Sequence, residues 1–381
     1  MTSRLRSTNP SERPGALRRG LAAVTATAVL SLLALPGCAP AVGQRGPAGS
    51  ELDRPALDRY LAGQLDALGL PGMAVTVVRG RDVLYVQGFG LDGHGHPVEE
   101  TTQFMLASLS KSFTAVAVLQ LARTGRIDLD APVRDYLSEF TTSDPDASGR
   151  ITVRHLLHHT SGLADAGFRA GLSAKSGSLA QRVRDLQTAS LVSEPGQQFH
   201  YFEPNYQLLA RLVEVVTGEP FEHYLAHRVF RPVGLTGTVA ADTTAEARRS
   251  APRLAKGHVV VFGVPVARQE LDGLLTGSSG VVSTAQDIAR WLVLHLTEGR
   301  VRGSLTGLQQ DDFHLMHTPQ LESAALTGRA GSWSLPATDL AGSNTPAYCP
   351  RSPPTRCCCP TAGTGSPCCT TATPRSPTPL D

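Results

Sequence analysis

Apolar positions between residues 52 and 124 predict a helix, two strands and a second helix. From Leu52 to Leu68, apolar residues recur at helical spacing, which indicates an amphipathic helix. Two strand-like runs follow, Met73–Arg79 and Val83–Gly90, and the residues Gly80-Arg81-Asp82 between them suit the turn of a hairpin. The segment Met105–Val118 is apolar nearly all round, so we expect a well-buried helix over residues 108–124.

The pattern beyond residue 150 is mostly helical. We expect helices with loops over 150–193 and one or two further helices over 205–228. Val259–Ala267 reads as a strand, and Thr284–Leu296 as another amphipathic helix. A few strands, a central run of helices and a return to strands predict an α/β sandwich with an all-helical insert.

Residues 1–38 have the features of an export signal. Five arginines precede residue 20, and the apolar run Leu21–Leu35 that follows is too short for a typical membrane span. The run ends in Leu35-Pro36-Gly37-Cys38, which resembles a bacterial lipobox and predicts lipid attachment at Cys38. Plain cleavage and an uncleaved anchor remain open. We therefore expect an exported protein held at the cell membrane surface, with residues 39–51 as a flexible tether.

Composition and charge narrow the class of protein. With 41% hydrophobic and 18% charged residues, the chain is globular rather than disordered. The formal charge is only +2, without a clustered basic face, so we expect no nucleic-acid partner. Residues 39–348 contain no cysteine, so the domain is expected to be stabilised by its core rather than by disulfides.

The character of the sequence changes after about Gln320. Six of the seven cysteines lie in the last 33 residues, among many prolines, threonines and serines. No helical or strand periodicity is present there, which is typical of a disordered tail. Cys357-Cys358-Cys359 and Cys368-Cys369 lack the Cys-x-x-Cys spacing of zinc sites, so we expect no metal.

The start of the buried helix carries a candidate nucleophile, in Ser108-Leu109-Ser110-Lys111. Residues three apart share a helix face, so the Lys111 amine can reach the Ser108 hydroxyl. The helix N-terminus favours negative charge on the serine oxygen, and burial lowers the proton affinity of a lysine, which lets it act as a base. The alternative is an N-capping serine with a solvent-facing lysine. The apolar surroundings favour a lysine that points into a cleft.

Four segments in order resemble the serine β-lactamase and penicillin-binding protein superfamily, in its class C, D-alanyl-D-alanine carboxypeptidase and esterase branch. They are Ala107–Thr114 (Ala-Ser-Leu-Ser-Lys-Ser-Phe-Thr), Gly125–Val133, Ile151–Leu163 (with His-His-Thr-Ser-Gly-Leu) and Gly277–Trp291. The resemblance implies an antiparallel sheet flanked by helices plus an all-helical subdomain over residues 52–322, with Ser108 as acyl-accepting nucleophile and Lys111 as its partner. It implies no cofactor.

The family's second motif, Tyr-x-Asn, corresponds to Tyr201-Phe202-Glu203. The resemblance gives Tyr201 the role of proton shuttle and places Glu203 at the asparagine position, which contacts the lysine and the substrate. A tyrosine that faces a lysine ammonium is expected to have a lowered pKa. A carboxylate at Glu203 would instead hold Lys111 protonated and oppose its role as a base. His155, His158 and His159 have ligand-like spacing but no nearby carboxylate, so we expect no metal site.

The family's third motif, a Lys-Thr-Gly or His-x-Gly triad on the strand beside the nucleophile, is missing between Gln320 and Asp381. Read one base out of register, Leu326–Gly331 permits Tyr-Gly-x-Gly-Trp and Asn344–Ala347 permits His-Ser-Gly, both family-like and in the right order. We therefore predict an aberrant tail, residues 323–381, produced by a frameshift near Gln320 that is either real or a sequencing error. The C-terminal strands of the domain would then be missing.

The sequence thus predicts a surface-anchored serine hydrolase that acts through an acyl-enzyme on a small-molecule or peptide substrate. The substrate would be a cell-wall D-alanyl peptide, a β-lactam or an ester. A catalytically inactive, surface-anchored binding relative and a nonfunctional frameshifted product remain as alternatives, because Glu203 and the lost triad weaken the case for activity.

Overall fold

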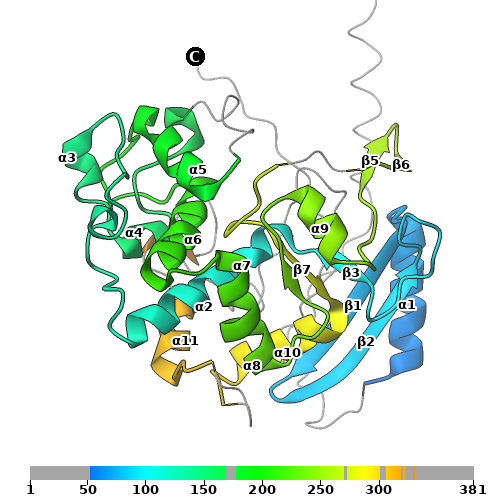
Figure 1. Cartoon of the computed structure of the whole chain (residues 1–381). Coiled ribbons are helices and arrows are strands. Elements are labelled where there is room, and N and C mark those ends of the chain that lie inside the picture. Colours follow the sequence, from blue (N-terminus) through cyan, green and yellow to red (C-terminus); the bar gives the residue numbers. More distant parts are fainter. Residues whose placement is uncertain are drawn as a thin grey trace, which may run out of the picture. The chain divides into compact units, whose positions relative to one another are not determined.

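The computed structural model describes residues 52–168, 177–269, 273–300 and 306–318, together with two short paired strands, β8 (Leu321–Glu322) and β9 (Arg329–Ala330) (Figure 1). These residues all belong to one compact unit, Gly49–Asp381. The predicted lipid site at Cys38, the tether and, apart from β9, the predicted out-of-frame tail lie outside the described residues. Within the described ranges, no helix has the length and apolar character needed to cross a membrane.

The first elements form a layered unit around a hairpin, as the apolar pattern predicts. Helix α1 (Arg54–Ala67) is capped by Asp53, whose side chain accepts a hydrogen bond from the backbone of Ala56. Strands β1 (Gly72–Arg79) and β2 (Asp82–Gly90) pair antiparallel. Their alternating side chains pack against α1 on one face and against α10 (Ala285–Leu296) on the other.

A second sheet has the strand order β3-β7-β4 and is antiparallel throughout; its strands are β3 (Gln103–Met105), β7 (Val281–Thr284) and β4 (Val239–Ala240). The central strand β7 is buried along its whole length. Its last residue, Thr284, also caps α10, because its hydroxyl accepts a hydrogen bond from the backbone of Asp287.

The helical part surrounds the central helix α2 (Ser110–Arg123), which packs against α6 (Glu203–Thr217) within the largest apolar cluster. The remaining α-helices are α3 (Pro145–Ser148), α4 (Val153–Leu157), α5 (Leu179–Asp185), α7 (Phe221–Tyr224), α8 (Arg231–Val233), α9 (Thr244–Ser250) and α11 (Gln310–His317). Short 3₁₀ turns lie at Ala107–Leu109, Val133–Asp135, Asp165–Gly167 and Leu186–Thr188, and Leu225–Phe230 is π-helical. The predicted α/β class with its antiparallel sheet and helical subdomain is confirmed.

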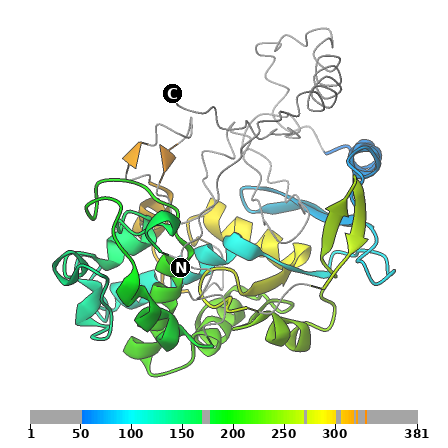
Figure 2. The same ribbon diagram turned by 90° about the horizontal axis from the view of Figure 1, so that it is seen from above.

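One predicted strand proves to be two. The segment Val259–Ala267 forms a hairpin of β5 (His258–Val261) and β6 (Val264–Ala267), joined by Phe262 and Gly263. The turn is hidden in the sequence because Phe262 continues the apolar run and replaces the usual Asn or Asp before glycine. Figures 1 and 2 place this hairpin beside the α1–β1–β2 side of the unit and away from α4, α5 and α6.

Candidate active site

Ser108 lies in the 3₁₀ turn that precedes α2, directly after a residue with unusual backbone geometry. Ala107 has a φ of 48°, in the left-handed region that side chains other than glycine rarely adopt. Such strain persists only where the surrounding structure enforces it, and it often marks a functional turn. Here it carries the chain from the end of β3 into the start of α2.

The start of α2 is fastened to the segment before β7. The Ser110 hydroxyl accepts a hydrogen bond from the backbone of Val281 at 3.0 Å, and the Thr114 hydroxyl donates to the carbonyl of Gly277 at 2.6 Å. Gly277 has a φ of 77°, and a Cβ there would lie 2.4 Å from the carbonyl oxygen of Tyr206 on α6. Only glycine fits at position 277, where the chain passes between α2 and α6.

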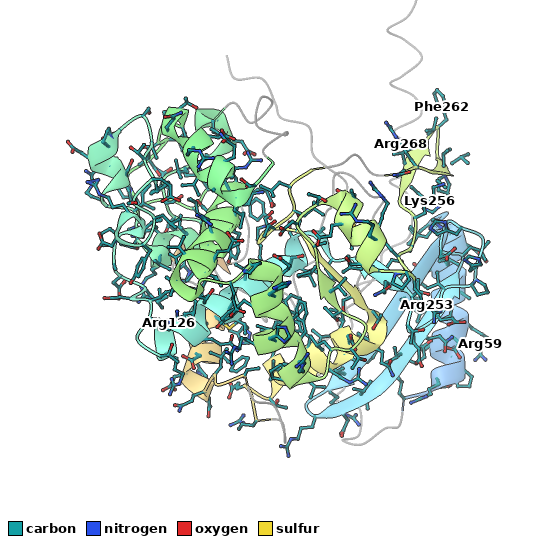
Figure 3. All side chains as sticks on the ribbon, in the orientation of Figure 1. Arg59, Arg126, Arg253, Lys256, Phe262 and Arg268 are labelled. Carbon is teal, nitrogen blue, oxygen red and sulfur yellow. The ribbon has the colours of Figure 1, made fainter. Side chains whose placement is uncertain are left out.

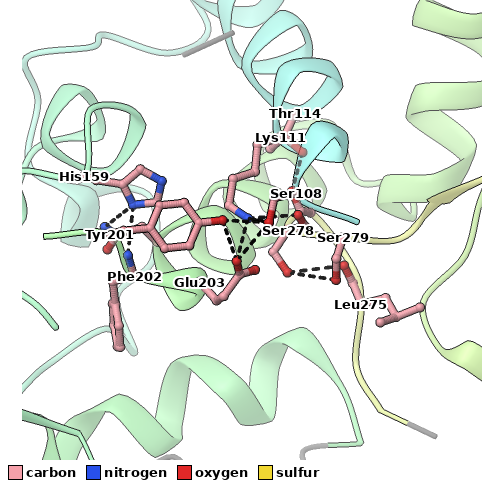
Figure 4. A network of polar contacts seen from close by, with 12 residues as sticks. Ser108, Lys111, Thr114, His159, Tyr201, Phe202, Glu203, Leu275, Ser278 and Ser279 are labelled. Atoms are coloured by element: carbon pink, nitrogen blue, oxygen red, sulfur yellow. Dashed lines mark hydrogen bonds and ion pairs between the residues drawn. The ribbon is translucent and has the colours of Figure 1, made fainter. Parts of the chain in front are cut away.

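Lys111 points inward, with 8% of its side chain exposed, so the solvent-facing alternative does not describe this lysine. Its amine Nζ lies 3.3 Å from Ser108 Oγ, 2.8 Å from Glu203 Oε1 and 3.0 Å from the carbonyl oxygen of Ser278 (Figure 4). An ammonium group has three hydrogens, and these three acceptors satisfy all of them. A neutral amine can keep two of the bonds as donor and accept the Ser108 hydrogen with its lone pair.

Tyr201 and Glu203 complete the arrangement from the loop before α6 and from its first turn. The Tyr201 hydroxyl lies 2.7 Å from Ser108 Oγ and donates to Glu203 Oε1 at 2.6 Å. Ser108 Oγ is itself 3.4 Å from the same carboxylate oxygen. The four residues predicted from the motifs therefore meet around one serine oxygen (Figure 4).

The protonation equilibria follow from burial and from the Lys111–Glu203 contact. Burial lowers the pKa of Lys111, although the Glu203 carboxylate opposes this shift. Burial raises the pKa of Glu203, but the charge of Lys111 and hydrogen bonds from Lys111, Tyr201 and Ser278 outweigh it and keep the carboxyl ionised. The expected lowering of the Tyr201 pKa is wrong. Burial and the adjacent Glu203 carboxylate raise that pKa, so Tyr201 is a neutral phenol.

His159 is a site residue that the sequence analysis considered only as a metal ligand and as part of the Ile151–Leu163 motif. Its ring centroid lies 4.6 Å from that of Tyr201 and 5.1 Å from that of Tyr206. Its Nδ1 accepts a hydrogen bond from the backbone of Phe202 at 3.2 Å, so the ring hydrogen sits on Nε2. Burial and the nearby Lys111 keep the pKa of His159 well below its ordinary value. A neutral histidine thus supports the Tyr201 ring from behind.

Asn205 does not take the place of the missing motif asparagine. It is fully buried, and its amide contacts His159 Nδ1 at 3.3 Å and the Ser161 hydroxyl at 3.0 Å, away from Ser108. Ser278, which the sequence reasoning quoted only within a motif, supplies the carbonyl that holds Lys111. The sequence marked Ser278 only by its place directly after Gly277 at the start of the Gly277–Trp291 motif.

The histidines with ligand-like spacing have structural partners. His155 Nδ1 accepts a hydrogen bond from the backbone of Thr152 in the capping box of α4. Among the residues that the structure describes, no group of three or more His, Cys, Asp or Glu side chains is arranged to hold a metal ion.

The position of Ser108 before a helix bears on where negative charge could be stabilised. Ser108 lies in the 3₁₀ turn directly before α2, where the helix dipole favours negative charge. The resemblance would put a strand with the third motif opposite Ser108; that motif is missing from the sequence, and residues 331–381 lie outside the described ranges.

Comparison with known proteins identifies a family and several relatives of this chain. Residues 57–343 match the family model described as Beta-lactamase. Protein flp of Staphylococcus aureus (strain COL) is 25% identical over 244 residues, which cover 63% of this chain and 48% of flp. Penicillin-binding protein 4 of Amycolatopsis lactamdurans is 31% identical over 236 residues, 60% of each chain. The chain thus spans about half the length of flp.

Among solved structures, the chain resembles EstCE1, described as a hydrolase with promiscuous acyltransferase activity. The TM-score is 0.61 at 25% identity, over 72% of this chain and 80% of EstCE1.

Proposed function

Because the chain belongs to the beta-lactamase family of serine hydrolases, we propose that it cleaves an amide or ester through an acyl-enzyme on Ser108. The observation that supports this most directly is the position of Ser108 Oγ, within hydrogen-bonding distance of both Lys111 Nζ (3.3 Å) and the Tyr201 hydroxyl (2.7 Å). A nucleophile that contacts a buried amine and a phenol has a proton acceptor and a proton carrier at hand.

In the proposed acylation, Lys111 reacts as the neutral amine. It takes the proton from Ser108 Oγ while still donating to Glu203 and to the Ser278 carbonyl. Ser108 Oγ then bonds to the carbonyl carbon, and the bond to the leaving nitrogen or oxygen breaks. Tyr201, a neutral phenol 2.7 Å from Ser108 Oγ, gives its hydrogen to the leaving group and regains one from Lys111 through Glu203 Oε1, which contacts both side chains. Water repeats the sequence in reverse and releases the acyl group.

Glu203 lowers the fraction of Lys111 that is ready for this step. The carboxylate stabilises the ammonium form through the 2.8 Å contact. Its side chain is 42% exposed, so a substrate could reach it from solvent. We propose that Glu203 takes the substrate-contacting position of the family's asparagine. The enzyme would then be slow at neutral pH and faster as pH rises through the pKa of Lys111.

The relatives suggest the substrate class. One is named as a penicillin-binding protein and another as a hydrolase with acyltransferase activity. We propose that the substrate is a cell-wall D-alanyl peptide, a β-lactam or an ester, since each has a carbonyl carbon that the Ser108 hydroxyl can attack to form an acyl-enzyme. We also propose export and attachment at the membrane surface through Cys38.

Gel labelling of the full chain with a fluorophosphonate and a fluorescent penicillin, beside Ser108→Ala, tests the proposal. Label on the parent and none on the variant is the expected result. An unlabelled parent that melts cooperatively would refute catalysis and favour a second function. That function is binding of cell-wall peptide without acylation, motivated by the carboxylate at Glu203 and measurable as peptidoglycan co-sedimentation.

A further inference from the structure

The hairpin β5–β6 exposes an unusual amount of apolar surface. Each of its strands pairs only with the other among the described residues. Five large apolar side chains on it are exposed: Val260, Val261, Phe262, Val264 and Val266. None of them joins a buried apolar cluster within the part of the chain that the structure describes. An isolated two-stranded hairpin is at best marginally stable in water, so a covering surface is expected.

The tip of the hairpin adds a strained aromatic residue to this surface. Phe262 and Gly263 form a two-residue turn with φ values of 49° and 82°, the combination that type I′ turns require. A bulky residue is disfavoured in this left-handed region, where Asn, Asp or Gly is usual. Phe262 is fully exposed, so no packing against a described residue offsets the cost of this backbone conformation.

Basic residues lie at the base of the hairpin. From Ala247 to Gln269 the sequence holds five Arg and Lys residues and no Asp or Glu. Lys256 and Arg268 stand at the base of the two strands, and neither forms an ion pair within the described ranges, whereas Arg253 is paired with Glu99. Figure 3 shows Phe262 at the outer end of the hairpin, with Arg268 and Lys256 closer to the rest of the unit. Burial lowers the pKa of His258, so that residue adds no charge at neutral pH.

The base of the hairpin is held by the rest of the fold. The backbone of Lys256 donates to the carbonyl of Asp92 at 2.8 Å, and that of Ala255 donates to the carbonyl of Gln103 at 2.8 Å. The tip therefore projects from a fixed support.

We propose that the β5–β6 hairpin docks on an anionic lipid bilayer, with Phe262 and the neighbouring valines in the headgroup–acyl boundary and Lys256 and Arg268 against anionic headgroups. Apolar side chains with adjacent cations are the combination that binds such interfaces. The open strand edges restrict the docking to this shallow depth, because unpaired backbone groups do not enter the hydrocarbon core. This inference does not depend on the proposed catalysis.

Charge favours lipid over two other occupants. A second copy of the hairpin would bring Lys256 and Arg268 against the same basic residues. Residues 319–381 of this chain hold three acidic and four basic residues, so they offer no complementary charge. An anionic bilayer can bind both parts of the hairpin, because its acyl boundary accepts the apolar tip and its headgroups attract Lys256 and Arg268.

The test is co-flotation of the full chain with lipid vesicles. The chain carries Cys38→Ser to exclude lipid attachment at that residue. The vesicles contain either phosphatidylcholine with phosphatidylglycerol or phosphatidylcholine alone. The informative variant is Phe262→Gly, because it removes the aromatic side chain and relieves the backbone strain. We expect its melting temperature to match or exceed the parent's and its vesicle affinity to fall roughly tenfold. Lys256→Gln with Arg268→Gln should weaken binding roughly fivefold per charge on anionic vesicles only. The matched control is Arg59→Gln with Arg126→Gln, exposed arginines outside the hairpin (Figure 3).

Three results would overturn the proposal. The first is unchanged vesicle binding by Phe262→Gly. The second is a parent dimer in solution that this variant converts to monomer, which would make a second copy the occupant. The third is strong amide-exchange protection of residues 258–267 without vesicles, which would show that the chain covers its own hairpin.

Discussion

Replacement of Glu203 by asparagine tests how the active site controls the proton of Lys111. In the parent, Lys111 Nζ and Glu203 Oε1 are 2.8 Å apart, and the carboxylate favours the ammonium form. At an effective dielectric constant of about 20, two such charges attract by about 6 kcal/mol. Solvent screens this pair because the Glu203 side chain is 42% exposed, so the contact stabilises the ammonium form by on the order of 1 kcal/mol, well below the unscreened figure.

Glu203→Asn should therefore lower the pKa of Lys111, because the carboxylate that stabilises the ammonium is lost, and should speed the reaction roughly fivefold in the pH range where neutral amine is scarce. Since the neutral amine is the reactive form, activity rises with pH through this pKa, and the variant's acid limb moves to lower pH. The assay is the second-order rate of fluorophosphonate labelling of Ser108 across the pH range. Glu194→Gln is the matched control, because that exposed carboxylate pairs with Arg150 and has no contact with Lys111.

Two results would refute this reasoning. An acid limb that stays in place would mean that Glu203 does not set the Lys111 equilibrium. A slower variant whose acid limb disappears would mean that the carboxylate itself receives the Ser108 proton through the Tyr201 hydroxyl.

Three further predictions concern the remaining contacts. Tyr201→Phe should slow acylation by a fluorescent penicillin roughly 100-fold, because the leaving nitrogen then lacks its proton donor. The melting temperature should not fall, because Tyr201 is 47% exposed and loses only its hydroxyl. An equally fast variant would exclude Tyr201 as proton carrier. Gly277→Ala should lower the free energy of unfolding by about 3 kcal/mol or more, because a Cβ there would lie 2.4 Å from the Tyr206 carbonyl oxygen. The control Gly125→Ala has a similar φ but open space, so it should cost only about 1 kcal/mol. Equal costs in denaturant titrations would contradict the close approach of Gly277 to α6. Thr284→Ala should cost about 1 kcal/mol through loss of the α10 cap, and no change in the denaturation midpoint would argue against that cap.

Local periodicity and spacing suffice for much of the fold and for the centre of the site. The helical period over residues 52–68 and the two strand-like runs predict α1, β1 and β2 because these elements are amphipathic and adjacent in sequence. The Ser-x-x-Lys spacing brings Ser108 and Lys111 together because three residues make nearly one helical turn.

The errors arise where several distant groups act on one atom. The pKa of Tyr201 was expected to fall because only the charge of Lys111 was considered. Burial and the Glu203 carboxylate act in the opposite direction, and their balance depends on distances that a motif does not contain. His159 and Ser278 contact the site through a ring face and a backbone carbonyl, neither of which has a residue-type signature. The β5–β6 turn was missed because an apolar residue occupies a position that usually holds a polar one.

The shielded His159 has a consequence for how this enzyme class is diagnosed chemically. Histidine-selective acylating reagents such as diethyl pyrocarbonate need an accessible ring nitrogen, and they inactivate hydrolases whose base is a histidine. Here the residue is 6% exposed, and its Nδ1 is occupied by the Phe202 backbone. Resistance to such a reagent, together with loss of activity to an amine-directed reagent that reaches Lys111, would distinguish this serine–lysine site from a serine–histidine one without knowledge of its substrate.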